Sequence, residues 1–454
     1  MKRIFLILLN IELCFIPLFL SGQEIDSVPG KIESYLSSAV NAWKFNGVAL
    51  VARKDGIIFH KAYGWQNYSD KKVSDTSTCY PLLSITKSFT ALAIMKLQEL
   101  KKLSLNDKVN RYLPDFPNGN NISIEQLLDH TSGMHNFTDD IGEEDSAIVN
   151  HPVKREFMMK LIAEKPVDFK PGKSFQYNNS GYYLAGLIIE KVTGKSYEQN
   201  VRELIFQPLG MDHSGFDYPG LDPSLKATGY QFLNDIRQKI YPYLDSTVSF
   251  SAGSIYSTSS DLFKFTKAIA DKRIISPDSW KVLLAKRKGG FGLGFRIGSY
   301  NGINYIRHSG GYPGFVTEYV YYPEKDVTII LLKNSGNYGE DVWPVAMGLS
   351  DIMFGNPYDL WKLRKSIYVP ENILKEYEGK YVLGKTTVSF VVRDHQLVLI
   401  LADGSEIILF AESMQTFFPL IYNTTVHFIR DENGKFTKAN VHEHGKDDVY
   451  RKKI

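Results

Sequence analysis

Cysteine is almost absent from this sequence, in which only Cys14 and Cys79 occur. Cys14 lies inside an apolar N-terminal segment, so a mature chain would keep Cys79 alone and would form no intramolecular disulfide. An excess of charge is also lacking, because the formal net charge is +3, and this excludes a broad basic surface for nucleic acid. We therefore expect packed cores to stabilise the protein, and we expect no nucleic-acid partner.

Long apolar runs are missing after the start of the chain. The start, MKRIFLILLNIELCFIPLFLSGQ, places two basic residues before an apolar stretch that ends near Leu20 and is followed by Ser21 and Gly22. This order predicts a secretory signal over residues 1–22 and an exported protein, either periplasmic or secreted. A retained N-terminal anchor is the alternative. No stable membrane span is expected once the signal is cleaved.

Two kinds of periodicity alternate along the chain. GVALVARKDGIIFHKAYG, residues 47–64, has two β-rich runs around a turn and predicts a β-hairpin. Helical periodicity follows over residues 84–101 and 181–194, and residues 304–336 alternate short β runs with Gly and Pro, as antiparallel strands do. We predict an α+β fold in which hairpin and late strands share one antiparallel sheet flanked by helices, next to a helical region.

The composition changes towards the C-terminus. Short β runs such as TTVSFVVRDHQLVLILADGSEIILF are separated by turns and predict a small all-β domain, similar to a barrel. We therefore divide the chain into a signal (1–22), an α+β domain (23–356), a linker (357–378) and a C-terminal barrel-like domain (379–454).

Ser84 and Lys87 open the apolar stretch YPLLSITKSFTALAIMKLQEL. Residues at i and i+3 lie on one face of a helix, so the amine can reach the hydroxyl. A serine hydroxyl becomes a nucleophile when a base takes its proton, and burial among residues such as Leu83 and Phe89 would lower the lysine pKa enough for that role. Taken alone, S-x-x-K is more typical of a serine near a helix start and a solvated lysine one turn later.

Two further patterns supply suitable polar groups. Tyr177 and Asn179 form Y-x-N before the second helical stretch, where a tyrosine near a lysine can move a proton and an amide can bind a substrate amide. His308, Ser309 and Gly310 follow on a predicted strand, where imidazole and hydroxyl would hold a carboxylate and glycine would let a substrate backbone approach. Each pattern by itself is more typical of a helix cap or a strand end.

In this order, S-x-T-K at Ser84, Y-x-N at Tyr177 and H-x-G at His308 resemble the serine β-lactamase and penicillin-binding-protein superfamily. Y-x-N is similar to the motif of its class C β-lactamase, DD-peptidase and esterase branch. Flanking segments add to the resemblance, namely IEQLLDHTSGM, GLIIEKVTGKSYEQNVRELIFQPLGM and SAGSIYSTSSDLFKF. It covers about Lys31 to Asn356, and the C-terminal part resembles the β-barrel appended to many of these hydrolases, where it would shield or narrow the active-site mouth.

The resemblance implies a β-lactamase/transpeptidase-like fold and an acyl-serine mechanism at the junction of sheet and helical region. Ser84 would attack a carbonyl, and Lys87 and Tyr177 would relay the proton. Asn179 would orient the acyl side chain. The backbone N–H groups of Ser84 and Gly311 would form the oxyanion hole. The resemblance implies neither a cofactor nor a metal.

His308 departs from the family pattern, because the β-lactamases usually carry lysine there in K-T-G. Losing that fixed charge weakens the binding expected for a β-lactam carboxylate, although Ser309 keeps the hydroxyl that contacts it, and Gly310 completes the predicted binding set. We therefore predict a serine hydrolase for D-amino-acid peptides, including peptidoglycan-derived ones, or small esters. A β-lactamase, or a penicillin- or peptidoglycan-binding protein that acylates without turnover, is the alternative; the oligomeric state stays open.

Three other signals have weaker implications. Residues 136–157 are candidate pocket walls, in which Asp139 and its acidic neighbours could attract an amine-bearing substrate or form a solvated loop. His442 and His444 alternate along a predicted strand and are expected at an exposed strand end instead of in a metal site. His130 is expected to be structural.

Overall fold

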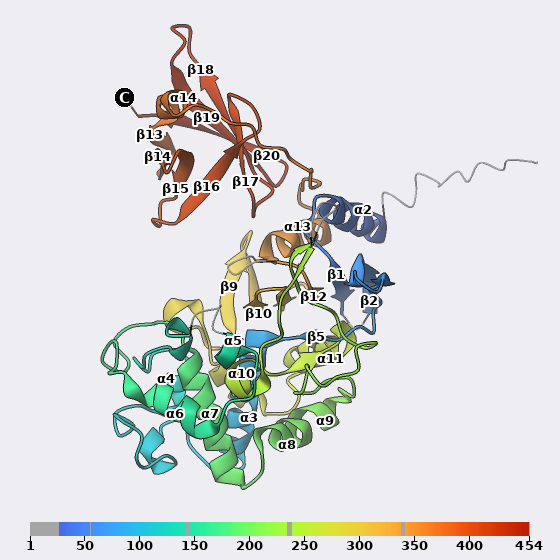
Figure 1. The fold of residues 1–454 in the computed structure, drawn as a ribbon, viewed down its shortest axis with the longest axis vertical. Coiled ribbons are helices and arrows are strands. Elements are labelled where there is room, and N and C mark those ends of the chain that lie inside the picture. Colours follow the sequence, from blue (N-terminus) through green and yellow to red (C-terminus); the bar gives the residue numbers. More distant parts are fainter. Residues whose placement is uncertain (1–26, 55, 142–145, 234–237, 337–340, 454) are drawn as a thin grey trace, which may run out of the picture.

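The computed structural model describes residues 27–453 apart from 55, 142–145, 234–237 and 337–340. The predicted signal therefore lies outside the described residues. A layered α/β body carries a β-barrel at one end, and the barrel holds the C-terminus (Figure 1). Within the described ranges, no helix is both long and apolar enough to cross a membrane.

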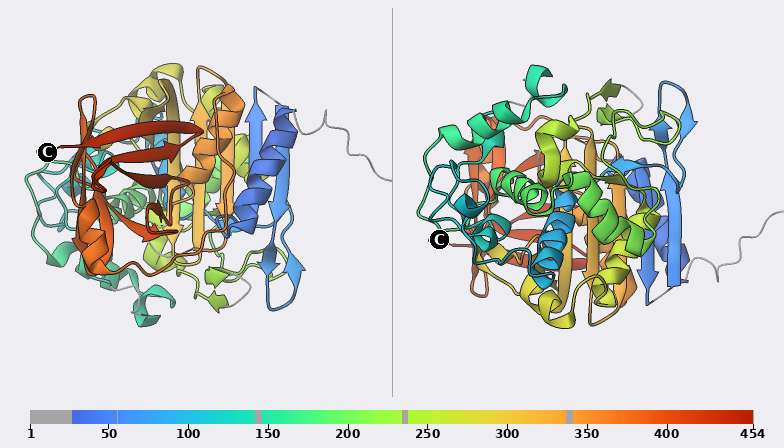
Figure 2. Two further views of the ribbon diagram at one scale, coloured as in Figure 1. Left: turned by 90° about the horizontal axis from the view of Figure 1, so that it is seen from above. Right: turned by 90° about the horizontal axis from the view of Figure 1, so that it is seen from below.

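One antiparallel sheet forms the centre of the body (Figure 2). Its strands are β1 (Gly47–Arg53), β2 (Gly56–Tyr63), β9 (Arg296–Tyr300), β10 (Ile303–Tyr312), β11 (Phe315–Tyr322) and β12 (Val327–Lys333). In the described chain their order is β2-β1-β12-β11-β10-β9. β1 pairs with β12 from Gly47 opposite Lys333 to Arg53 opposite Val327. The predicted α+β class, with hairpin and late strands in one sheet, is confirmed.

Helices cover both faces of this sheet, and this explains why its central strands are apolar at nearly every position. They include α2 (Val28–Asn41) and α13 (Trp343–Phe354) on one face and α3 (Thr86–Glu99) and α11 (Ser259–Ala270) on the other. β1 divides its side chains by alternation: Val48 and Leu50 belong to the core with α3, whereas Ala49 and Val51 belong to the core beneath α2 and α13. Every residue of β11 and β12 is buried.

The helical region lies on the α3 side of the sheet (Figure 1). Its helices are α4 (Ile124–Leu128), α5 (Ser146–Val149), α6 (Arg155–Glu164), α7 (Asn179–Thr193), α8 (Tyr197–Val201), α9 (Gln207–Leu209), α10 (Ser246–Gly253) and α12 (Pro277–Leu284). Short ladders pair β3 (Trp65–Asn67) with β4 (Lys72–Val73), β5 (Tyr80–Pro81) with β8 (Tyr256–Ser257), and β6 (Tyr230–Leu233) with β7 (Gln238–Ile240). Helix α7 confirms the predicted helix and begins two residues earlier, after the N-cap Asn178.

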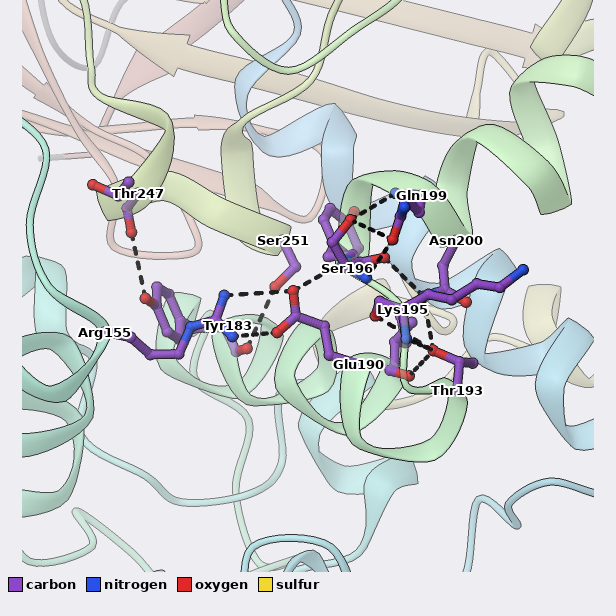
Figure 3. Close-up of polar contacts among 12 residues, drawn as sticks. Arg155, Tyr183, Glu190, Thr193, Lys195, Ser196, Gln199, Asn200, Thr247 and Ser251 are labelled. Atoms are coloured by element: carbon purple, nitrogen blue, oxygen red, sulfur yellow. Dashed lines mark hydrogen bonds and ion pairs between the residues drawn. The ribbon is translucent and has the colours of Figure 1, made fainter.

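Helix α7 is fastened to its neighbours (Figure 3). Glu190 near its C-terminal end forms an ion pair with Arg155 of α6. The Ser251 hydroxyl of α10 donates to the carbonyl oxygen of Tyr182 of α7 at 2.9 Å. These contacts fix the helix whose first residue is Asn179.

The C-terminal part forms a closed antiparallel barrel, as predicted. Its elements are α14 (Glu371–Tyr377), β13 (Gly379–Leu383), β14 (Thr386–Arg393), β15 (Gln396–Ile400), β16 (Glu406–Ala411), β17 (Thr416–Pro419), β18 (Thr425–Arg430), β19 (Phe436–Glu443) and β20 (Lys446–Lys452). Aromatic side chains such as Tyr381, Phe390 and Phe428 fill its interior. Leu374 and Tyr377 of α14 pack into the same core, so this helix belongs physically to the barrel, although it lies in the segment that we assigned to the linker.

The barrel contacts the body through the turn that follows β19. His444 Nδ1 lies 2.9 Å from an Asp351 carboxylate oxygen on α13, and His442 Nε2 lies 3.0 Å from Asp359 in the connecting segment. The other ring nitrogen of His442 lies 3.0 Å from Asp447. Because carboxylates accept at both nitrogens, His442 must be a protonated imidazole. The prediction of an exposed strand end is wrong, since both histidines are partly buried between barrel and body.

Both histidines have a raised pKa. The hydrogen bond to Asp359, supported by Asp447, raises the pKa of His442. Burial alone would lower the pKa of His444, but the hydrogen bond to Asp351 and the charge of Glu443 outweigh it. A raised pKa in the folded state gives stabilisation that is complete below the unfolded value of about 6.5 and is lost as pH rises through the folded value.

We predict that this contact stabilises barrel docking in acid and not in base. His442→Gln should lower the midpoint of thermal unfolding by about 2–4 °C near pH 5.5 and by much less near pH 8.5, since a partly exposed ion pair contributes at most about 1 kcal/mol. Differential scanning calorimetry at both pH values measures this. His427→Gln is the control, because the contact of His427 with Thr416 joins two strands of the barrel. An equal loss at both pH values would contradict the prediction.

Candidate active site

Ser84 lies in a strained turn at the start of α3. The turn is a short 3-10 segment, Leu83–Ile85. Leu83 has a backbone φ of +51°, a value that residues other than glycine rarely adopt. The Thr317 hydroxyl of β11 donates to the Leu82 carbonyl oxygen at 3.1 Å. A Cβ on Gly310 would lie 2.2 Å from that same carbonyl. Strands β10 and β11 therefore hold the turn in place, and the missing side chain of Gly310 makes room for the protein's own backbone.

Lys87 supplies a buried amine to this turn. Its side chain is fully buried, and its Nζ donates to Ser84 Oγ at 2.9 Å and to the Ala252 carbonyl oxygen of α10 at 2.8 Å. Burial holds the pKa of Lys87 well below its usual range. A neutral amine can keep its bond to Ala252 and still accept the Ser84 proton, so the pair fits a nucleophile and its base.

Tyr177 packs beside this amine. Lys87 Nζ lies 5.0 Å from the centre of the Tyr177 ring. His130 supports the ring from behind at a centroid distance of 4.4 Å, and its Nδ1 accepts the Asn178 N–H at 3.1 Å. Burial holds the pKa of His130 well below its usual range, so the ring adds no charge next to Lys87. A φ of +62° at His130 shows that its backbone is strained as well.

Asn179 is positioned by a residue that the motifs did not identify. The Asn136 side-chain oxygen accepts the Asn179 N–H at 2.8 Å, and Asn179 Nδ2 donates to the Thr138 hydroxyl at 3.0 Å. The Asn136 amide also donates to Asp139 at 2.7 Å. Sequence position alone gave no signal for this, because Asn136 lies more than forty residues from Asn179 and the two meet only in the fold.

His308 is neutral in this setting. Its Nδ1 lies 2.7 Å from the Ser309 carbonyl oxygen, which can only accept, so the ring proton is on Nδ1. Burial lowers the pKa of His308 to about 3. The neutral ring has one N–H, and this N–H donates to the Ser309 carbonyl oxygen. His308 therefore has no donor left for a substrate carboxylate. This geometry does not support the predicted contact between His308 and a carboxylate, and Ser309 alone keeps a hydroxyl there.

Two connected cavities open beside Ser84. The first has a volume of about 510 Å³ and the second about 410 Å³, and Ser84, Tyr177 and Gly311 line both. The first is also lined by Asn179 and by the side chains of Phe137, Asp139, Ile141, Val149, Leu244, Val248 and Tyr312, and the second by Phe175, Phe291, Arg296, His308 and Ser309. Several described residues of the segment 136–157, such as Phe137, Asp139 and Val149, thus line the first cavity, as predicted. Among the described residues, none of the barrel lines either cavity, so the predicted shielding of the mouth finds no support.

Residues 34–345 match the Beta-lactamase family. The chain belongs to this family. It is 28% identical to Penicillin-binding protein 4* of Bacillus subtilis over 86% of this chain and 91% of that protein. It is 30% identical to Teichoic acid D-alanine hydrolase of Staphylococcus aureus over 68% of this chain and 74% of that protein. The solved octameric penicillin-binding protein homologue from Pyrococcus abyssi has 26% identity and a TM-score of 0.65 and covers 93% of this chain and 99% of its own.

As a member of the Beta-lactamase family, the chain is a serine hydrolase with the predicted β-lactamase/transpeptidase-like fold. The structure places Ser84, Tyr177 and Asn179 around one cavity and bonds the Lys87 amine to Ser84, as the resemblance implied, although Ser84 lies in the turn before the helix. Gly310 lines neither cavity. Arg296, which begins β9, was missed because nothing in its local sequence marks it.

We predict that the pH dependence of kcat/KM follows Lys87. Activity should fall in acid through an apparent pKa well below the usual lysine value of about 10.4, because the amine must be neutral to take a proton. Lys87→Met should lower kcat/KM by about 10²–10⁴-fold. Lys96→Met, at the other end of the same helix, should leave it unchanged, since the partners of Lys96 among the described residues are Ile274 and Glu99. A pH profile that changes only near pH 10 would contradict the assignment.

Proposed function

We propose that this protein is an exported hydrolase, periplasmic or secreted, that cleaves D-amino-acid peptides or small esters through an acyl-Ser84 intermediate. The bond from the buried Lys87 amine to Ser84, at 2.9 Å, is the observation that carries the proposal. The match to the Beta-lactamase family and the Y-x-N motif at Tyr177 support a mechanism of the class C and DD-peptidase type. The apolar N-terminal segment supports export.

The proposed steps are those of an acyl-serine mechanism. Ser84 Oγ attacks the substrate carbonyl while Lys87 takes its proton. Lys87 passes this proton on through Tyr177 to the leaving group as the scissile bond breaks, which returns both residues to their starting state. The N–H groups of Ser84 and Gly311 stabilise the oxyanion, and each such donor contributes roughly 3 kcal/mol. A Cβ on Gly311 would face open space, which leaves room for a bound carbonyl. Water then attacks the acyl-enzyme and releases the acid.

The two cavities divide the substrate between them. Asn179 would orient the acyl group in the first cavity, and the leaving group would occupy the second. His308 is neutral, so Arg296 takes over as the cation on the leaving-group side, and Ser309 supplies a hydroxyl. A leaving group with a terminal carboxylate, such as D-alanine, fits this side. Related proteins named as a penicillin-binding protein and a D-alanine hydrolase agree with this substrate class.

Intact-mass analysis tests the nucleophile and the acyl donor together. We expect a transient adduct, or product, with a D-alanyl-D-alanine peptide or a small ester, and none with Ser84→Ala. A long-lived adduct with penicillin and no product from the others would favour a binding protein without turnover. Rapid hydrolysis of penicillin itself would favour a β-lactamase. No Ser84-dependent change with any of the three would contradict the proposal.

We predict that Arg296→Gln selectively weakens substrates with a carboxylate on the leaving group. The ratio of kcat/KM for N-acetyl-D-alanyl-D-alanine over its C-terminal amide should fall by about tenfold, as expected for a lost charge-assisted hydrogen bond. Lys286→Gln removes one nearby charge outside the cavity lining and should preserve the ratio. An unchanged ratio in Arg296→Gln would remove Arg296 from the binding site.

A further inference from the structure

The two cavities next to Ser84 carry opposite charges. Asp139 is the ionisable carboxylate in the first cavity, and Arg296 is the cation in the second. His308 is neutral and does not change this pattern. The nucleophile therefore lies between a negative and a positive wall.

The charge of Asp139 is not neutralised by the protein. Its one side-chain partner is the neutral amide of Asn136, and no described cation forms an ion pair with it. Nearby cations are already engaged elsewhere: Lys165 lies 3.7 Å and His135 lies 3.2 Å from the neighbouring Asp140. Asp139 is exposed, and within the described part of the chain its Oδ2 has no side-chain hydrogen bond or ion-pair partner, so this oxygen can bind a ligand.

Asn136 also fixes where this carboxylate lies. Its oxygen accepts the N–H of Asn179, and its amide nitrogen donates to Asp139 Oδ1 at 2.7 Å. One side chain therefore couples Asp139 to the residue that would orient the acyl group. The rest of this cavity is mainly apolar, with Phe137, Ile141 and Val248 among its walls.

We propose that Asp139 forms an ammonium-binding subsite, so that the preferred acyl group carries a free amine together with an apolar part. This inference rests on the proposed hydrolase function and deepens it, because it specifies the acyl donor as an amine-bearing aminoacyl group. A carboxylate held by a neutral amide, with an unused oxygen at the edge of an apolar cavity, recognises an ammonium by charge and hydrogen bonding. An acyl group whose only amine is acetylated brings no charge to this wall.

Three p-nitroanilides test the subsite: D-alanine p-nitroanilide, Nα-acetyl-D-lysine p-nitroanilide and N-acetyl-D-alanine p-nitroanilide. We expect one of the two amine-bearing compounds to exceed the third in kcat/KM by about fivefold, the value for a solvent-accessible ion pair. The better of the two shows whether the amine lies on the α-carbon or at the end of a side chain. Asp139→Asn should abolish the preference. Asp140→Asn, whose carboxylate pairs with His135 and Lys165, should keep it.

Equal kcat/KM for all three compounds in the wild type, or a preference that survives in Asp139→Asn, would overturn the inference. Ser84-dependent turnover of the N-acetyl compound tests the hydrolase function separately, because that compound has no amine. If no compound is turned over, calorimetric binding of D-alaninamide and of N-acetyl-D-alaninamide to Ser84→Ala decides the matter. Tighter binding of D-alaninamide that disappears when Asp139→Asn is added would support the subsite, and equal binding would reject it.

Discussion

The buried hydrogen bond between Lys87 and Ser84 is the interaction on which the rest of this structure depends. An ammonium ion at this depth would cost several kcal/mol, so burial shifts the amine towards its neutral form. The neutral amine is also the form that can take a proton from a hydroxyl. Packing and catalysis thus both require a Lys87 amine that is shielded from water. The Ala252 carbonyl oxygen accepts the hydrogen bond that water would otherwise accept.

Among the described non-glycine residues with a positive φ, three lie around this amine. Leu83 precedes the nucleophile, Phe250 lies two residues before Ala252, and His130 packs on Tyr177; their φ angles are +51°, +35° and +62°. Such conformations cost about 1–3 kcal/mol each in non-glycine residues. They persist because the large core around α3 fixes every segment involved. These three backbone conformations therefore help to bring the Ser84 hydroxyl, the Lys87 amine and the Tyr177 ring together.

The chemistry was predictable from sequence where it is local and unpredictable where it is tertiary. Ser84 and Lys87 are three residues apart, so helix geometry alone brings them together, and alternation gave the sheet. Asn136 and Arg296 reach the cavity from distant elements and have no local mark. The neutral state of His308 depends on burial beneath Phe291 and on its own neighbouring carbonyl, which no motif specifies. Segment 371–377 was assigned to the linker because its apolar residues do not follow the alternation of a strand. In the structure, Leu374 and Tyr377 of this segment pack into the barrel core.

The position of the barrel changes what it can do for the reaction. It docks against α13 and the connecting segment, on the sheet face opposite α3, and none of its described residues lines either cavity. Strand β9 nevertheless joins the two places. Arg296 at one end lines the second cavity, and Tyr300 at the other end donates to Asp351 at 2.7 Å, the carboxylate that also holds His444. The five residues of β9 thus connect the barrel contact at Tyr300 with the cavity wall at Arg296.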